Sequence, residues 1–198
     1  MTQGLRERKK ARTRASLREH ALRLIREHGY TATTVEQIAA AAEVSPSTFF
    51  RYFPTKEDVI LQDDLDVRMV EAFERQPADM SVIAAIRAAT REAMGSYTED
   101  DLALLLQTTE LTRTVPEIRA RAIDEFARSI HVIAGAIAER SGRPEDDLAV
   151  RAMAGAVIGV MMAITLPVWE TEPTDRSLLD SLGQFDEALA LLETGLPL

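Results

Sequence analysis

Helical periodicity runs through almost the whole of this 198-residue chain and constrains its fold more than any other feature. Apolar residues recur three and four positions apart, which is the spacing of one face of an α-helix. No segment shows the strict apolar–polar alternation of a half-buried strand, and no repeat or low-complexity segment interrupts the pattern. We therefore predict an all-α protein of about nine helices.

Gly29 and a pair of threonines mark the boundary between the first two predicted helices. Apolar residues at helical spacing predict a first helix, which Gly29 closes as a C-cap residue. The second helix begins at Thr33 or Thr34, because each has a capping-box partner three residues later. Glu43 and Val44 then turn the chain.

The dipeptide Ser45-Pro46 predicts the start of a third short helix. Serine suits the N-cap position, and proline suits the first helical position because its missing N–H is not needed there. This helix runs to about Phe53, since Pro54 cannot continue it. Thr55 caps a fourth helix. The three-helix head therefore contains two short helices joined by a tight turn, which is the geometry of a helix-turn-helix.

Five further helices are predicted beyond residue 77, and segments with proline separate the later ones. They cover residues 80–96, 99–113, 116–140, 144–170 and 175–193. The uncharged stretch 152–169 is about as long as a membrane span. Gly155, Gly159 and Pro167 within it, and the lack of flanking basic clusters, favour a buried helix. We expect no membrane partner.

Charge divides the chain into a basic head and an acidic body. Residues 1–60 contain 11 Lys/Arg and 7 Asp/Glu, whereas residues 61–198 contain 12 and 25. This asymmetry favours a polyanion as the partner of the head. Six basic residues precede the first predicted helix: Arg6, Arg8, Lys9, Lys10, Arg12 and Arg14. They form either an arm attracted to phosphates, with strong salt dependence, or a solvated, disordered tail.

Several kinds of chemistry find no support in the sequence. Cysteine is absent, so neither a disulfide framework nor a thiolate metal site is possible, which fits a cytoplasmic location. The charged N-terminus lacks the apolar region of a secretory signal. The three histidines show no metal-ligand spacing, and no Gly-rich phosphate loop is present. We expect no enzyme activity, no metal and no cofactor.

The helix-turn-helix assigns distinct tasks to the polar residues around its second helix. Hydroxyls in the exposed first turn can reach base edges in the major groove, and basic and hydroxyl groups nearby can reach phosphates. Ser45, Ser47 and Thr48 are the candidates for bases. Thr34, Tyr52 and Lys56 are the candidates for phosphates, with Arg51 beside them.

Residues 14–60 resemble the N-terminal DNA-binding domain of the tetracycline-repressor (TetR) family of transcriptional regulators. The matching parts are Gly29-Tyr30, Thr33-Thr34-Val35, Ile38-Ala39, Val44-Ser45, Thr48-Phe49, Tyr52-Phe53 and Lys56-Glu57. The resemblance implies a DNA-binding domain over residues 1–55 and a ligand-binding and dimerisation domain over residues 56–198. It also implies a homodimer that binds a partly palindromic double-stranded DNA operator.

The resemblance also implies roles position by position. Positions 46–48 would face bases, positions 50 and 52 would face bases or backbone, and Thr34 and Lys56 would face phosphates. This chain departs from the family pattern at two positions. Position 46 is often basic in the family and is Pro46 here, and position 50 is often tyrosine and is Phe50 here.

Phe50 has two interpretations, and the sequence does not decide between them. Its ring either presses on a thymine methyl in the major groove or packs in the core of the head. Phe49 and Phe53, in contrast, are expected to be core residues.

Two sets of residues in the last helices are candidates for the dimer interface. One is a 4-3 spaced seam: Leu178, Leu182, Phe185, Leu189 and Leu192. The other is a stripe of small residues: Ala152, Gly155, Ala156, Gly159 and Ala163. The family uses its last two major helices for a four-helix dimer bundle. The alternative is packing within one chain.

A ligand site, if the body has one, is expected between its central helices. The candidate lining residues are Met94, Tyr97, Leu106, Thr109, Phe126, Ile130, His131, Met161 and Trp169. A mostly apolar lining suits a lipophilic or amphipathic small-molecule effector. The segment from "PEIRARAIDEF" to "AIAERSG" is also similar to TetR-family bodies that bind acyl-CoA-like ligands. The alternative for each residue is plain core packing.

These observations predict a ligand-responsive repressor that an effector releases from DNA. Two other hypotheses stay open at this point. One is a small-molecule carrier whose head no longer binds DNA, and the other is an architectural DNA binder without sequence preference.

Overall fold

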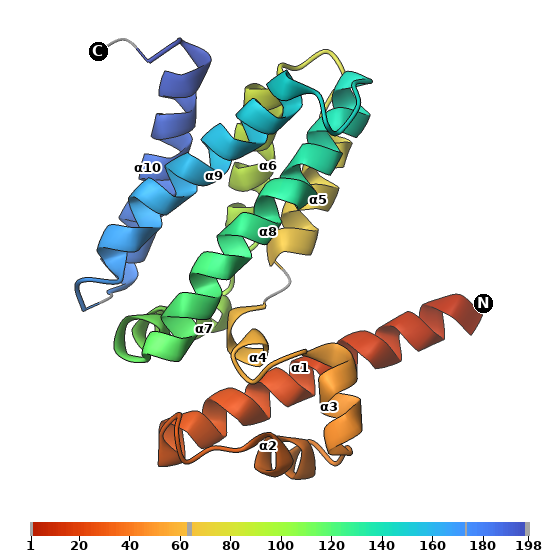
Figure 1. Ribbon diagram of the computed structural model, residues 1–198, viewed down its shortest axis with the longest axis vertical. Coiled ribbons are helices and arrows are strands. Elements are labelled where there is room, and N and C mark those ends of the chain that lie inside the picture. Colours follow the sequence, from red (N-terminus) through yellow and green to blue (C-terminus); the bar gives the residue numbers. More distant parts are fainter. Residues whose placement is uncertain (1, 63–64, 173, 197–198) are drawn as a thin grey trace. The chain divides into compact units, whose positions relative to one another are not determined.

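Ten helices and no strand make up the residues that the computed structural model describes, which are 2–62, 65–172 and 174–196. The side chains of residues 2–7, 65–67, 175–179 and 182 are not described. The predicted all-α fold is confirmed. The chain divides into two compact units, residues 1–63 and residues 64–198 (Figure 1). We call them the head and the body.

The head contains α1 (Thr2–His28), α2 (Val35–Ala41), α3 (Pro46–Tyr52) and α4 (Asp58–Leu61). Helix α2 packs against α3, and α1 packs against both α2 and α4. Their apolar faces meet in one core, because each helix is too short or too polar to be stable without tertiary packing. The largest fully buried side chains of this core are Leu17, Ile38, Phe49, Phe53, Val59 and Ile60.

Helix α1 is longer at its N-terminal end than predicted. The basic segment does not precede the first helix but forms its first turns, because α1 begins at Thr2. The segment is rich in arginine, lysine and alanine, which favour the helix, and it contains no proline. The predicted C-terminal end is confirmed: Gly29 follows α1 with a φ of 84°, a conformation that glycine adopts readily.

The predicted fourth helix is two helices in the structure. Helix α4 ends where the backbone becomes extended at Gln62, with φ −79° and ψ 106°. Helix α5 (Leu65–Arg75) then belongs to the body. Thr55 does exchange hydrogen bonds with Asp58, N to Oδ2 at 3.0 Å and Oγ1 to N at 3.2 Å, as a helix-capping residue would.

The body contains α5 and five further helices: α6 (Val82–Gly95), α7 (Glu99–Thr114), α8 (Pro116–Ser141), α9 (Leu148–Val168) and α10 (Asp175–Glu193). Helix α8 packs against α9, α5 packs against α6, and α10 packs against both α6 and α9 (Figure 1). Alanines of α6 are fully buried in the core, so the neighbouring helices can approach closely. The predicted ranges of these helices are correct to within a few residues.

Helix α9 is more apolar than its burial in one chain explains. By length and composition alone it could cross a membrane, but only 22% of its apolar window is buried inside the chain. Core helices of soluble proteins pass the same test, so one such helix is weak support for a membrane span. The other residues of α9 are half-buried or exposed in the single chain.

Candidate functional site

The N-terminal turn of α3 gathers three hydroxyl groups. Ser45 is the N-cap residue, and its Oγ accepts a hydrogen bond from the backbone N–H of Thr48 at 3.1 Å. The same oxygen lies 2.8 Å from Ser47 Oγ and 3.0 Å from Thr48 Oγ1. Ser45, Pro46 and Ser47 are exposed, and Thr48 is half-buried. This turn therefore presents small polar groups to solvent.

The aromatic residues of α3 divide between two faces. Phe49 and the following Phe53 have no exposed surface, and their ring centroids lie 5.8 Å apart. Phe50 is 52% exposed, with its ring at an edge-to-face angle to Phe49 and 5.5 Å away. The core interpretation of Phe50 is therefore wrong. The buried pair fixes α3 to the head, and Phe50 lies on the open face.

Three other predicted DNA-facing residues, Thr34, Arg51 and Tyr52, are exposed or half-buried. Thr34 is exposed and is the N-cap residue of α2, with a complete capping box to Gln37. Arg51 is exposed, and its guanidinium lies 5.5 Å from the ring of half-buried Tyr52. The hydroxyl, aromatic and basic groups are the types that contact bases and phosphates.

Lys56 is oriented differently from the other predicted phosphate contacts. Its Nζ donates hydrogen bonds to the carbonyl oxygens of Tyr30 and Thr33, both at 3.0 Å. It also lies 3.8 Å from the centroid of the Tyr30 ring. The Tyr30 hydroxyl in turn donates to Glu57. We call Lys56, Tyr30 and Glu57 the loop clamp.

Tyr30 and Glu57 were not predicted as functional residues. Both occur in the matching dipeptides of the head, but the sequence does not show that residues 27 positions apart make contact. Burial raises the pKa of the Glu57 carboxyl, but hydrogen bonds from Tyr30, the backbone and Thr55, with the charge of Lys56, together hold that pKa below its ordinary value.

The basic residues of α1 have unlike environments. Arg8, Lys9, Lys10 and Arg12 are exposed, and the side chain of Arg6 lies outside the described residues. Arg14 instead packs in the head: its guanidinium lies 4.9 Å from the Phe53 ring, and its Nη2 donates to Gln62 Oε1 at 3.0 Å. Arg14 therefore joins α1 to the end of α4.

The body contains a partly open apolar cavity of about 160 Å³, which lies among α5, α6, α8, α9 and α10. Its apolar lining includes Phe73, Ile86, Ile133, Val157, Met161 and Phe185. Three polar residues of α8 also line it: Glu125, Arg128 and Ser129. Glu125 and Arg128 form an ion pair. An apolar chamber with a few polar groups is the usual form of a small-molecule site.

Met161 is the one predicted ligand residue that lines this cavity. Ile130 and His131 line a separate open groove between α8 and α9. Phe126 stacks on buried Trp169 at 5.9 Å, and Thr109 is buried. The remaining predicted residues are half-buried: Met94, Tyr97 and Leu106. The structure therefore does not bring these nine residues into one site.

Sequence reasoning missed most of the cavity because α5, α6 and α10 contribute to it. Each contributes residues such as Phe73, Ile86 and Phe185, which have the spacing of ordinary core positions. Periodicity identifies the apolar face of a helix, but it does not show where neighbouring faces leave a space.

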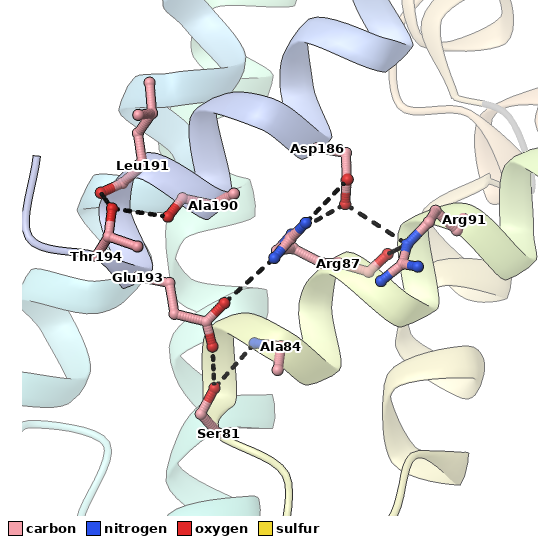
Figure 2. Close-up of polar contacts among 9 residues, drawn as sticks. All are labelled: Ser81, Ala84, Arg87, Arg91, Asp186, Ala190, Leu191, Glu193 and Thr194. Atoms are coloured by element: carbon pink, nitrogen blue, oxygen red, sulfur yellow. Dashed lines mark hydrogen bonds and ion pairs between the residues drawn. The ribbon is translucent and has the colours of Figure 1, made fainter.

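Ion pairs hold α10 against α6 beside the cavity. Arg87 of α6 donates to both carboxylate oxygens of Asp186, each at 3.1 Å, and to Glu193 at 3.3 Å (Figure 2). Arg91 pairs with Asp186 at 3.6 Å, and Ser81 Oγ donates to Glu193 at 2.7 Å. The bonds to Asp186 raise the pKa of Arg87, and the Arg87 guanidinium lowers the pKa of Asp186. We call these five residues the α6–α10 ion-pair cluster.

The two predicted dimer sets differ in exposure. Ala152, Gly159 and Ala163 are exposed on α9, and Gly155 and Ala156 are half-buried. Phe185 and Leu189 are buried in the core of their own chain, and Leu192 packs partly buried against that core. The seam of α10 therefore differs from its prediction, because α10 packs on α6. The side chains of Leu178 and Leu182 lie outside the described residues.

No group of three or more histidine, aspartate or glutamate side chains within the described part of the chain could hold a metal ion.

Two protein-family models match the chain. The model of bacterial regulatory proteins of the tetR family matches residues 17–62, which contain α2, α3 and α4. The model of the MftR C-terminal domain matches residues 80–197, which is most of the body. Together they cover both units.

A curated relative and two solved structures are similar to the chain. The HTH-type transcriptional regulator TcmR of Streptomyces glaucescens is 37% identical over 151 residues, 73% of this chain and 67% of TcmR. The crystal structure of Thermus thermophilus FadR, a TetR-family transcriptional repressor in complex with lauroyl-CoA, is 28% identical. It covers 93% of this chain and 95% of FadR, with a TM-score of 0.55. Salmonella enterica GusR shares the fold at 19% identity, over 93% of this chain and 94% of GusR, with a TM-score of 0.50.

The proteins that this chain is similar to in these comparisons are transcriptional regulators and not enzymes. The MftR C-terminal model alone spans more than half of the chain, and the identity to TcmR extends over 73% of it. The chain belongs to the TetR family of transcriptional regulators.

Proposed function

We propose that this protein is a ligand-responsive repressor that binds a partly palindromic operator as a homodimer. The open face of α3 carries this proposal. Phe49 and Phe53 fix the helix from its buried side. The hydroxyls at its N-terminus, together with Phe50 and Arg51, are left on the side where a major groove would lie.

The contacts with DNA divide by chemistry. Ser45, Pro46, Ser47 and Thr48 would face base edges, and Phe50 would contact a thymine methyl. Thr34, Arg51 and Tyr52 would contact phosphates, which position the head without reading sequence. The exposed Arg8, Lys9, Lys10 and Arg12 of α1 would add attraction to the DNA backbone that weakens with salt.

A second copy of the chain would cover α9. Only 22% of its apolar window is buried in one chain, and small residues occupy part of its open surface. An open groove beside them has a volume of about 850 Å³ and is lined by residues of α8, α9 and the segment between them. Leu148 at its edge is 79% exposed. Small side chains let two helices approach closely, so a four-helix contact between copies would bury this surface.

The effector would bind in the apolar cavity of the body. Its lining suits a lipophilic or amphipathic molecule, with Arg128 and Ser129 available for a polar group. The similarity to FadR, which was crystallised with lauroyl-CoA, supports a ligand with an apolar chain. Binding would favour a conformation of the dimer whose α3 helices no longer match successive major grooves. As a transcriptional repressor, the protein would act in the cytoplasm.

The test is a selection of bound sequences from random DNA duplexes, followed by titration with lauroyl-CoA. We expect a preferred sequence with related half-sites and weaker binding when lauroyl-CoA is added. No preferred sequence would contradict operator binding. Ligand binding without any effect on DNA affinity would favour the carrier hypothesis instead.

A further inference from the structure

We propose that Lys56 is a positioning residue of the DNA-binding head and does not contact a phosphate. The inference rests on the proposed DNA binding by the head. The Lys56 ammonium joins the segment after α3 to the loop between α1 and α2. It therefore holds the N-terminus of α2, with Thr34, in place relative to α3.

The Lys56 ammonium makes its contacts with other residues of the head. A lysine ammonium has three N–H donors. Two of those of Lys56 donate to the Tyr30 and Thr33 carbonyls at 3.0 Å, and the Tyr30 ring centroid lies 3.8 Å away. A cation this close to an aromatic face is attracted to it. These three interactions all join Nζ to the loop between α1 and α2.

The Tyr30 ring is itself held from its other end. Its hydroxyl donates to the carboxylate of Glu57, the residue next to Lys56. The pKa of Glu57 lies below its ordinary value of 4.5, so the carboxylate is ionised at neutral pH and accepts this bond. Two consecutive residues therefore contact Tyr30: Lys56 lies over the face of its ring, and Glu57 accepts a hydrogen bond from its hydroxyl.

The carbonyls that Lys56 binds lie just before the start of α2. Thr33 is buried, and its Oγ1 donates to the Gly29 carbonyl at 2.9 Å. The next residue, Thr34, caps α2 by accepting from the Gln37 N–H at 3.3 Å and donating its own N–H to Gln37 Oε1 at 2.8 Å. A bond to the Thr33 carbonyl therefore fixes the peptide that leads into the cap.

The loop clamp links residues that are far apart in sequence, with 23 and 26 positions between Lys56 and its two carbonyl partners. It spans the helix-turn-helix, from the loop before α2 to the segment after α3. Loss of the clamp would allow α2 and α3 to move relative to each other, and the penalty would appear as weaker operator binding by an otherwise folded head.

Salt dependence separates positioning from phosphate contact. Removing a lysine that neutralises a phosphate lowers the slope of log affinity against log salt by about 1. For Lys56→Met, which keeps the length of the side chain, we expect operator affinity to fall roughly tenfold, the order expected for the loss of a charge-assisted hydrogen bond. The salt slope should stay at the wild-type value. Arg51→Met is the matched control, because it removes an exposed cation of α3 and should lower the slope.

Lys56→Arg provides a second criterion. Arginine binds phosphates well, so it would preserve a phosphate contact. The larger, planar guanidinium does not fit the point where the compact ammonium meets both carbonyls at 3.0 Å and the Tyr30 ring centroid at 3.8 Å, so it should disrupt the clamp and weaken operator binding much as Lys56→Met does. A lower salt slope for Lys56→Met, or wild-type affinity for Lys56→Arg, would overturn the proposal.

Hydrogen exchange in the free protein tests the clamp without DNA. Lys56→Met should accelerate exchange of the Thr33 and Gln37 amides, which hydrogen-bond to Tyr30 O and Thr34 Oγ1. Circular dichroism confirms that the variant is folded. Unchanged exchange would overturn the proposal, whatever the DNA result. If the wild-type protein binds no duplex selectively, the proposed function fails, and this exchange measurement still decides whether Lys56 holds the loop.

Discussion

Phe49 and Phe50 are neighbours in α3, yet one has no exposed surface and the other is 52% exposed. A seven-residue helix packed on one side buries only one face, and the bulky ring that follows a buried position points away from it. The two residues therefore have separate roles. Phe49 contributes to the stability of the head, and Phe50 leaves an apolar ring exposed to solvent.

Substitution of these two phenylalanines should separate stability from DNA binding. Phe50→Tyr should change the free energy of unfolding by less than about 0.5 kcal/mol, as exposed substitutions usually do. It should strengthen operator binding, because the added hydroxyl can donate to a phosphate. Thermal unfolding and a mobility-shift titration measure the two effects.

Phe49→Ala is the control, and should cost about 3–5 kcal/mol because it leaves a cavity in the core. Marked destabilisation by Phe50→Tyr would contradict the exposed position of that ring.

The residues that the sequence identified correctly are those governed by local rules. Ser45 and Gly29 cap helices as predicted, and Thr34 is the one of the two predicted candidates that caps α2, since a cap depends on residues three or four positions away. Lys56 shows the limit of such rules. Its type and neighbours suit a phosphate contact, but its bonds are to carbonyls 23 and 26 residues away, which only tertiary structure reveals.

At the scale of elements, α10 illustrates how burial and charge act together. Phe185 and Leu189 are buried in the core of the body. Asp186, next to Phe185, accepts hydrogen bonds from Arg87 of α6 (Figure 2). The 4-3 spacing of α10 predicted a helix with one apolar face, which is correct. It could not show that this face packs on α6 of the same chain, because spacing does not identify the partner.

The α6–α10 ion-pair cluster should make the stability of the body depend on pH. The folded pKa of Asp186 is below its ordinary value of 3.8, so its contribution is fully present above that pH and is lost as the pH falls through the folded pKa. We expect Asp186→Asn to lower the free energy of unfolding by about 1 kcal/mol at pH 7, since the pair is partly exposed. The difference from wild type should shrink below pH 3.8.

Denaturant unfolding, followed by the fluorescence of the single tryptophan Trp169, gives the free energy of unfolding of each protein at pH 7 and at pH 3. Glu187→Gln, an exposed carboxylate on the same helix, is the matched control. An equal difference between wild type and Asp186→Asn at pH 7 and pH 3 would exclude the ion pair as its cause.

Filling the cavity should separate the response to effector from DNA binding. Ala136 of α8 lines the cavity and is half-buried. A phenylalanine there should occupy the space and abolish the effect of lauroyl-CoA, because overlapping atoms exclude the ligand. Operator affinity without ligand should stay within about twofold, since substitutions far from a contact surface usually act independently. Fluorescence titration and mobility shift test this, and an unchanged response to lauroyl-CoA would place the effector elsewhere.

At the scale of the whole molecule, the open surface of α9 is what a single chain leaves unexplained. The long apolar run of this helix was predicted, and so was its buried character. In one chain most of that run is not buried, because α8 and α10 cover only part of the helix. A second copy would supply the missing contacts, and dimerisation would also place two heads on one operator.

Gly159→Arg tests the role of α9 without disturbing the fold of one chain. Gly159 is exposed, and nothing lies within 4 Å of where its Cβ would be. The variant should therefore stay folded and become monomeric, because a charged side chain would enter the contact between copies. Gly183→Arg on α10 is the control, since Gly183 is also exposed and nothing lies within 4 Å of where its Cβ would be. Analytical ultracentrifugation gives the mass of each, and a dimer of Gly159→Arg would exclude this part of α9 from the interface.

In the proposed dimer, two copies of α3 bind one operator in successive major grooves. The most direct measurement is the affinity of the protein for its selected duplex, compared with the same duplex carrying an insertion of about half a helical turn, roughly 5 base pairs, between the half-sites. The insertion should abolish specific binding, and restoring a full turn should recover part of it. Equal affinity for the two duplexes would contradict paired recognition by a dimer.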